Sequence, residues 1–122
     1  MSKAFFLDTY AIIEMIKGNK NYEKYKTAGK ITSMLNLLEL YYALLKDYDE
    51  KTADFYFTIF LNFSITYSDK TIKNAAKFRL ANKGKKLSYV DCLGYILALE
   101  NEVQFLTGDK GFESMKYVEF VK

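Results

Sequence analysis

QFLTGDKGF, residues 104–112, is a short apolar run that ends at Thr107 and continues directly into Gly-Asp-Lys-Gly. KAFFLD, residues 3–8, has the same form, because its apolar run also ends in an acid. Short apolar runs bounded by polar residues are consistent with buried strands. If these two strands are parallel neighbours, Asp8 and Asp109 both lie at the carboxyl edge of the sheet, where open α/β sheets bind their ligands.

Outward from these two runs, the hydrophobic periodicity divides the chain into alternating segments. We predict strands at 3–7, 30–33, 64–68, 103–107 and 117–121. We predict helices at 9–17, 19–28, 34–46, 49–63, 69–83 and 88–101, and a helical turn at 109–114. This alternation favours an α/β fold in which helices cover both faces of a mainly parallel central sheet. The sequence has no proline, repeat or linker, so we predict a single domain over 1–122.

The absence of histidine is the most informative feature of the composition. It excludes Ser-His-Asp and Cys-His nucleophilic machinery, imidazole acid–base catalysis and His-ligated zinc sites. An enzyme of this composition depends on carboxylates, which suit hard cations such as Mg²⁺ or Mn²⁺ and indicate a metal-dependent reaction on a phosphate. The net charge of +3 is compatible with a polyanionic substrate.

Three features of the sequence bear on where in the cell the protein is located. The single cysteine, Cys92, cannot form an internal disulfide and is expected to be a small buried hydrophobe. No stretch approaches the roughly 20 apolar residues that cross a bilayer, and the acid at position 8 comes too early for a signal peptide. We therefore expect a cytoplasmic protein without a membrane segment.

Two further acids stand alone on apolar predicted helices. Glu39 is the only charged residue in 31–45, and Asp91 is the only one in 87–99. An ionised carboxylate on a buried helix is costly unless solvent or a cation compensates for it. Asn36 lies one turn before Glu39 on the same face and can add an oxygen or an amide donor.

Each acid also has a purely structural explanation. Asp91 can form a capping box with Ser88, Asp8 suits a helix N-cap, Glu39 can extend to solvent, and Asp109 suits a turn. Four independent explanations nevertheless account poorly for the whole set. Like charges a few ångströms apart repel by about one to several kcal/mol, so such a cluster is stable mainly around a divalent ion. We therefore predict a metal site formed by these four acids.

Four segments together resemble the PIN-domain ribonucleases, and the compact length resembles the VapC-like toxin subunits of toxin–antitoxin pairs. The segments are FFLDTYAII (5–13), LNLLELYYAL (35–44), LSYVDCLGYILA (87–98) and FLTGDKGF (105–112). The resemblance implies a three-layer α/β/α fold and Mg²⁺- or Mn²⁺-dependent hydrolysis of RNA phosphodiester bonds. It also implies that the catalytic, metal-binding residues are Asp8, Glu39, Asp91 and Asp109.

The same resemblance assigns auxiliary positions. Thr9 matches the hydroxyl or polar residue after the first acid, Thr107 the Thr or Ser two places before the last, and Phe112 the aromatic residue that follows it. Tyr10 departs from the pattern, because an Asn is frequent at that position.

A basic stretch is the candidate RNA-binding surface, because cationic side chains neutralise phosphates. The alternative is that these residues are the solvated face of an amphipathic helix. No acid interrupts them, and they are Lys70, Lys73, Lys77, Arg79, Lys83, Lys85 and Lys86. An aromatic stretch such as FYFTIF (55–60) is more often core than interface, but this one exceeds what one helix face needs to bury. The resemblance implies that it helps to form a homodimer or a groove for an antitoxin helix.

Three different functions stay open beside the nuclease. A haloacid-dehalogenase-like phosphatase has similar opening and closing acids, but expects a second Asp where this chain has Tyr10. A non-catalytic RNA-binding domain is suggested by Gly108-Asp-Lys-Gly111, which resembles the GxxG loop of KH domains. A PIN domain that only binds RNA or a partner is the third, and the four acids argue against it.

Overall fold

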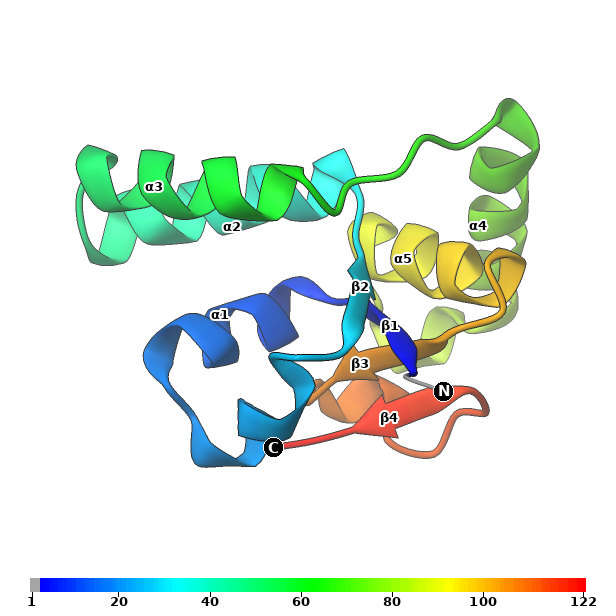
Figure 1. Cartoon of the computed structure of the whole chain (residues 1–122). Coiled ribbons are helices and arrows are strands. Elements are labelled where there is room, and N and C mark those ends of the chain that lie inside the picture. Colours follow the sequence, from blue (N-terminus) through cyan, green and yellow to red (C-terminus); the bar gives the residue numbers. More distant parts are fainter. Residues whose placement is uncertain (1–2) are drawn as a thin grey trace.

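The computed structural model describes residues 3–122 and shows helices arranged around a small sheet (Figure 1). Met1 and Ser2, which belong to the predicted domain 1–122, lie outside the described residues. The elements in chain order are β1 (Ala4–Leu7), α1 (Thr9–Lys17), the 3₁₀ helix η1 (Lys20–Tyr25), β2 (Gly29–Ile31), α2 (Met34–Asp47), α3 (Glu50–Leu61), α4 (Asp69–Ala81), the 3₁₀ helix η2 (Lys83–Lys85), α5 (Tyr89–Glu100), β3 (Gln104–Thr107), the 3₁₀ helix η3 (Lys110–Phe112) and β4 (Val118–Phe120).

The sheet has four strands in the order β2-β1-β3-β4, and every neighbouring pair is parallel. The central strands β1 and β3 are aligned so that Leu7 lies opposite Leu106. The main-chain N–H of Asp8 then donates a hydrogen bond to the Leu106 carbonyl at 3.1 Å. The prediction that these two strands are parallel neighbours is therefore confirmed. Asp8 and Asp109 follow them at the same edge of the sheet.

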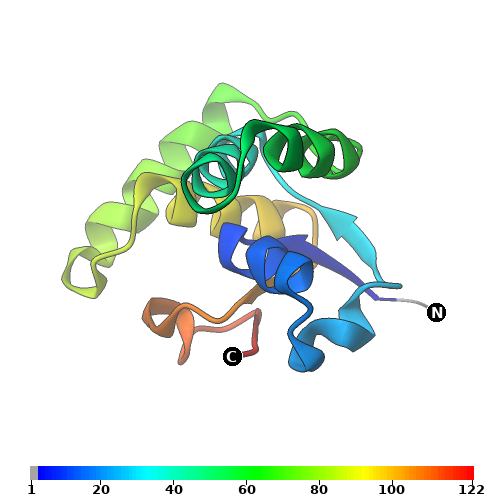
Figure 2. The ribbon, with the colours of Figure 1, turned by 90° about the vertical axis from the view of Figure 1, so that its left-hand side faces the viewer.

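Alternate residues of the central strands face two separate cores, because successive side chains of a strand point to opposite faces. Phe5, Leu7 and Leu106 pack in a core with side chains of α1, α2 and α3. Phe6 and Phe105 pack on the other side with side chains of α4 and α5. In both ribbon views α2 runs beside α3, and α4 beside α5 (Figure 1 and Figure 2). The three-layer α/β/α prediction is confirmed.

Gly94 allows α5 to approach the sheet closely. A Cβ built at Gly94 would lie 2.8 Å from the Phe6 ring and 3.0 Å from the Phe105 ring. Both distances are shorter than ordinary van der Waals contact, so any side chain here would push α5 away from the strands. Asp91, one of the four candidate acids, lies near the N-terminal end of α5.

The predicted strand at 64–68 was wrong. Only Ser64 pairs, in an isolated parallel bridge with Thr32, while the Ile65 N–H donates to the Thr32 carbonyl at 3.0 Å. The pairing stops there because the next residue, Ser33, already caps α2 and turns the chain out of the sheet. Residues 66–68 consequently have no strand beside them.

The predicted helix at 19–28 was also only partly right, because its helical part is the shorter 3₁₀ helix η1. The Asn19 side chain accepts a hydrogen bond from the Asn21 N–H at 2.9 Å, which begins a tight turn. Tyr22 and Tyr25 are both buried, and their spacing of three residues matches the three residues per turn of a 3₁₀ helix. Across the described residues 3–122, no helix is long and apolar enough to cross a membrane.

Candidate active site

Asp8 occupies the turn between β1 and α1 and is only 3% exposed. Its Oδ1 accepts a hydrogen bond from the Thr9 N–H at 2.9 Å, which caps α1. Its Oδ2 accepts from the Thr107 hydroxyl at 2.6 Å, across the sheet edge. Both oxygens are thus fixed by the two strand ends, and the carboxylate cannot rotate away without losing one of these bonds.

Asp109 lies at the equivalent junction after β3. Its N–H donates to the Thr107 hydroxyl oxygen at 3.0 Å, and its Oδ1 accepts from the Gly111 N–H at 2.9 Å. The second bond caps η3, so the turn-forming explanation of this acid holds. Thr107 joins the two junctions, because its hydroxyl donates to Asp8 and accepts from Asp109.

A hydrogen-bond network between α1 and α2 positions the side chain of Glu39. The Thr9 hydroxyl donates to Glu39 Oε1 at 2.7 Å and accepts from the Asn36 amide at 3.0 Å. The Ser33 hydroxyl in turn donates to Asn36 Oδ1 at 2.6 Å. Asn36 therefore uses its amide group to orient Thr9, and Thr9 orients Glu39.

Ser33 is the member of this network that was not predicted from the sequence. It also caps α2, because its side chain accepts from the Asn36 N–H at 3.2 Å. The Ser-x-x-Asn pattern at 33–36 before an apolar helix is the signal that could have identified it.

Asp91 forms the capping box with Ser88 that the sequence suggested. Its Oδ2 accepts from the Ser88 N–H at 2.9 Å, and the Ser88 hydroxyl accepts from the Asp91 N–H at 3.0 Å. The structural explanation of Asp91 is therefore correct. It fixes the side chain at the N-terminal end of α5 without excluding a second role for the other carboxylate oxygen.

Neighbouring negative charges contribute to the raised pKa values of three of the four acids. Burial raises the pKa of Asp8 to about 7, and the negative charges of Asp91 and Glu39 add to the rise, while hydrogen bonds from Thr107 and Thr9 oppose it. Burial also raises the pKa of Glu39 and of Asp91. The charge of Asp91 contributes to the shift of Glu39, and that of Asp109 to the shift of Asp91.

The donor chemistry suits a hard divalent cation. Glu39, Asp91 and Asp109 each use one carboxylate oxygen in a hydrogen bond to the chain. Within residues 3–122 no donor occupies their second oxygens, which are therefore available as ligands of the type that Mg²⁺ and Mn²⁺ prefer. In the same part of the chain, no three acidic, Cys or His side chains are close enough together to hold an ion.

Tyr10 packs on Gly108, which is the residue between Thr107 and Asp109 in the sequence. A Cβ at Gly108 would collide with the Tyr10 ring and with the Val121 carbonyl. The glycine is needed for this close approach, and the bulky residue at position 10 is accommodated because position 108 has no side chain.

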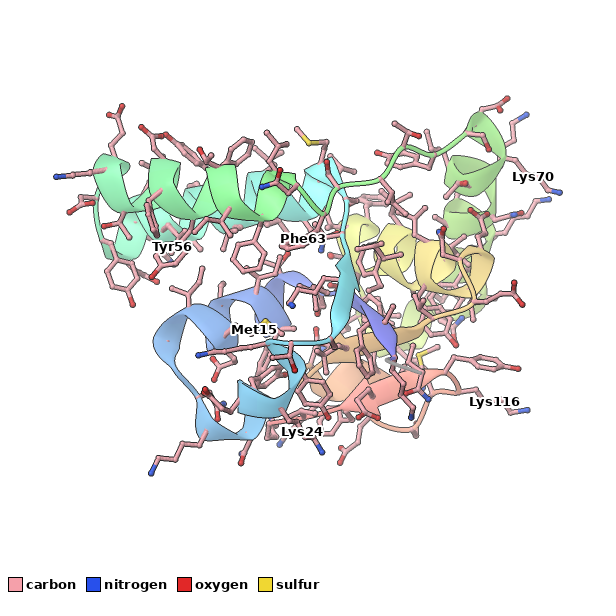
Figure 3. The ribbon with its side chains drawn as sticks, viewed as in Figure 1. Met15, Lys24, Tyr56, Phe63, Lys70 and Lys116 are labelled. Atoms are coloured by element: carbon pink, nitrogen blue, oxygen red, sulfur yellow. The ribbon has the colours of Figure 1, made fainter. Side chains whose placement is uncertain are left out.

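The seven predicted RNA-binding residues divide between α4 and the loop that follows it. Lys70, at the start of α4, lies far from the other end of that helix, since 13 residues span about 20 Å (Figure 3). The loop, residues 82–88, packs against the turn that carries Asp109. A Cβ at Gly111 would lie 2.8 Å from Leu87 Cδ2 and 3.6 Å from the Lys85 carbonyl. Lys83, Lys85 and Lys86 belong to this loop, and Arg79 lies in the last turn of α4.

Comparisons with known proteins agree with this architecture. Residues 5–117 match the family model of the PIN domain. No curated protein matches the chain.

Three solved structures share the fold. VapC20 of Mycobacterium tuberculosis, a Sarcin-Ricin loop cleaving toxin, superimposes with a TM-score of 0.79 at 16% identity over 94% of this chain and 97% of that one. A toxin–antitoxin complex from Klebsiella pneumoniae gives 0.74 at 19% identity, over 97% and 96%. VapBC2 of Rickettsia felis, bound to a DNA fragment, gives 0.73 at 20% identity, over 97% of each chain.

Proposed function

The chain belongs to the PIN-domain family, and from this premise we propose that it is a divalent-metal-dependent endoribonuclease. The observation that carries the proposal is Asp8, a buried acid with no cationic partner among residues 3–122, whose pKa rises to about 7 beside the negative charges of Asp91 and Glu39. Strongly shifted pKa values in a cluster of acids are typical of functional sites. RNA is the proposed substrate, the cytoplasm the proposed location, and Asp8, Glu39, Asp91 and Asp109 the proposed catalytic and metal-binding residues.

In the proposed mechanism, the chain's own residues hold the carboxylates in place. Thr107 fixes Asp8, Thr9 fixes Glu39, and main-chain N–H groups fix one oxygen each of Asp91 and Asp109. A bound Mg²⁺ or Mn²⁺ would supply the charge that polarises the scissile phosphate and activates a water molecule. The chain needs no nucleophile of its own, which agrees with its lack of histidine.

The test is cleavage of a structured RNA during titration with Mn²⁺. We expect wild type to cleave in proportion to bound metal and Asp8→Asn not to cleave, because the amide removes a negative charge from the ion's ligands. Asp47→Asn is the matched control, since Asp47 is exposed at the end of α2. Equal cleavage by wild type and Asp8→Asn, or a wild type that is inactive at every Mn²⁺ concentration, would contradict the proposal and favour a non-catalytic PIN domain.

The KH-like and phosphatase functions are not supported. The KH-like explanation of Gly108-Asp-Lys-Gly111 is wrong, because this segment joins β3 to η3 and a KH loop joins two helices. A phosphatase of the haloacid-dehalogenase type expects an acid at position 10, where Tyr10 packs on Gly108, and the PIN family match argues against that fold.

We also propose that the nuclease is a toxin controlled by an antitoxin protein. Two of the similar structures are described as toxin–antitoxin or VapBC complexes. A groove of about 420 Å³ lies between α1 and α3, with Met15 on one wall and Tyr56 and Phe63 on the other (Figure 3). Its lining is mainly apolar, with Lys26 and Lys30 among the lining residues, and suits the apolar face of a helix. Inducing the gene with and without its neighbouring reading frame tests the idea, and normal growth in both cases would contradict it.

A homodimer is a separate proposal. The α2–α3 hairpin exposes several large apolar side chains, including Leu38, Tyr42 and Phe55 at 64%, 67% and 60% exposure. Large exposed apolar patches mark interaction surfaces. The molar mass in solution, measured for wild type and for Leu38→Glu, tests it. A monomeric wild type would contradict the proposal.

A further inference from the structure

Tyr89 is a large aromatic residue that the proposed mechanism does not use. It is the first residue of α5 and 73% exposed, although it lies only two positions before Asp91. Two helical residues correspond to a rise of about 3 Å, so the backbone of Tyr89 lies close to that of Asp91, although the two side chains point to different sides of the helix. An exposed ring at this place is not explained by the packing of the core.

Arg79 holds one face of this ring. Its guanidinium carbon lies 4.1 Å from the Tyr89 ring centroid. The guanidinium is itself fixed, because Arg79 Nε donates to the Leu87 carbonyl at 3.0 Å and Leu87 is buried. One face of the ring is therefore supported by a fixed planar cation, and the high exposure of Tyr89 leaves the rest of the ring to solvent.

The surroundings of the pair are basic and lie next to the turn that carries Asp109. The loop that leads into Tyr89 carries Lys83, Lys85 and Lys86, all exposed. This loop packs on the Asp109 turn through its contacts with Gly111. A single strand whose phosphates follow the lysines would present its bases beside the Tyr89 ring.

We propose that Tyr89, supported by Arg79, stacks with one unpaired base of single-stranded RNA and positions the strand at the acidic site. Single-stranded RNA is favoured over duplex because only an unpaired base exposes a face to the ring, and every base offers one. Tyr89 is in this sense a positioning residue. The inference rests on the proposed function, and its test is a binding measurement that does not depend on cleavage.

The first measurement is the binding of a short fluorescein-labelled single-stranded RNA in EDTA, by fluorescence anisotropy. Tyr89→Ala should raise Kd about tenfold, the scale of one lost stacking contact, whereas Tyr89→Phe should stay near wild type because it keeps the ring. Tyr48→Ala is the control, since Tyr48 is an exposed tyrosine at the end of α2 and distant in sequence from the basic loop. Thermal melting of each variant verifies that it folds.

The second measurement reports stacking directly. A 2-aminopurine base in the same RNA should lose fluorescence on binding wild type and Tyr89→Phe, and should keep it on binding Tyr89→Ala. In the Mn²⁺ assay, Tyr89→Ala should raise KM and leave kcat nearly unchanged.

Failure of this inference and failure of the proposed function are distinguishable. If wild type binds and cleaves RNA while Tyr89→Ala binds equally well with the same quenching, only the stacking inference is overturned. Loss of binding in Tyr89→Phe as well as Tyr89→Ala also overturns it, because the hydroxyl would then matter rather than the ring. A wild type that neither binds nor cleaves RNA overturns both.

Discussion

The turns after β1 and β3 have the same sequence plan, an apolar strand followed by an acid and a helix start, yet their acids differ. Asp8 is 3% exposed, follows a strand with neighbours on both sides and begins a helix of nine residues. Asp109 follows an equally central strand, but it is only partly buried and begins a 3₁₀ turn of three residues. The difference shows that the burial of the side chain, rather than the local motif, decides how costly an ionised acid is.

The largest expected effect is on catalysis. Asp8→Asn should reduce the Mn²⁺-dependent kcat at least about 100-fold, a scale typical of removing one preorganised charge-stabilising group. Asp109→Asn should cost on the order of tenfold, or about 1.4 kcal/mol, because the amide keeps the bond to Gly111 and the residue is nearer solvent. Single-turnover cleavage rates measure both. Equal losses would mean that burial does not distinguish the two acids.

The next effect is on stability, and it depends on pH. Because the pKa of Asp8 rises from 3.8 to about 7 on folding, the folded state binds the proton more tightly. The stability from this group is present below about pH 4 and is lost as the pH rises through 7. Asp8→Asn should therefore stabilise the metal-free protein by about 2–4 kcal/mol at pH 8 and hardly at pH 4.

Urea unfolding in EDTA measures this difference, with Asp109→Asn as the comparison. That variant should change the free energy of unfolding by less than about 1 kcal/mol at either pH, as most partly exposed substitutions do. An Asp8→Asn protein that is less stable than wild type at pH 8 would contradict the argument from burial.

Metal binding should stabilise wild type. A divalent ion at about 100 times its Kd adds about 2.7 kcal/mol, which corresponds to a rise in Tm of several degrees. Asp8→Asn should lose most of this rise, and Asp109→Asn only part of it. Thermal melting with Mn²⁺ and with EDTA at pH 8 measures the effect. A shift of equal size in all three proteins would mean that the ion binds elsewhere.

The smallest effect concerns Thr107, which connects the two turns. Thr107→Val removes the hydroxyl that donates to Asp8 and accepts from Asp109, and should cost about 1–2 kcal/mol of stability. Since that hydrogen bond opposes the rise in the pKa of Asp8, the variant should raise this pKa further. NMR titration of the carboxyl measures it, with exposed Thr27→Val as the control. An unchanged pKa would contradict the role given to Thr107.

Much of the fold and the positions of the acids could be predicted because they depend on local patterns. The runs before Asp8 and Asp109 are apolar over the length of a strand, and the lone charges Glu39 and Asp91 are visible against apolar helices. Residues 64–68 have a similar strand-like pattern, but no partner strand extends beside them. A strand is stable only with a neighbour, and the sequence does not state which neighbours will be present.

The hydrogen-bond network around the acids could not be predicted in the same way. Thr9 and Asn36 are 27 residues apart, and Asp8 and Thr107 are 99 apart, so only the folded chain brings them together. The pairing of Tyr10 with Gly108 is equally non-local, although it accounts for the unusual residue at position 10.

Residue type and spacing along the chain were enough to indicate which segments are buried, where the acids follow strands, and that carboxylates without histidine must carry any chemistry. Three properties came only from the folded chain: the depth of Asp8, the raised pKa that results from that depth, and the place of Arg79 over Tyr89. Desolvation and contacts between distant residues depend on the packed arrangement of the whole chain, and these two effects separate Asp8 from Asp109.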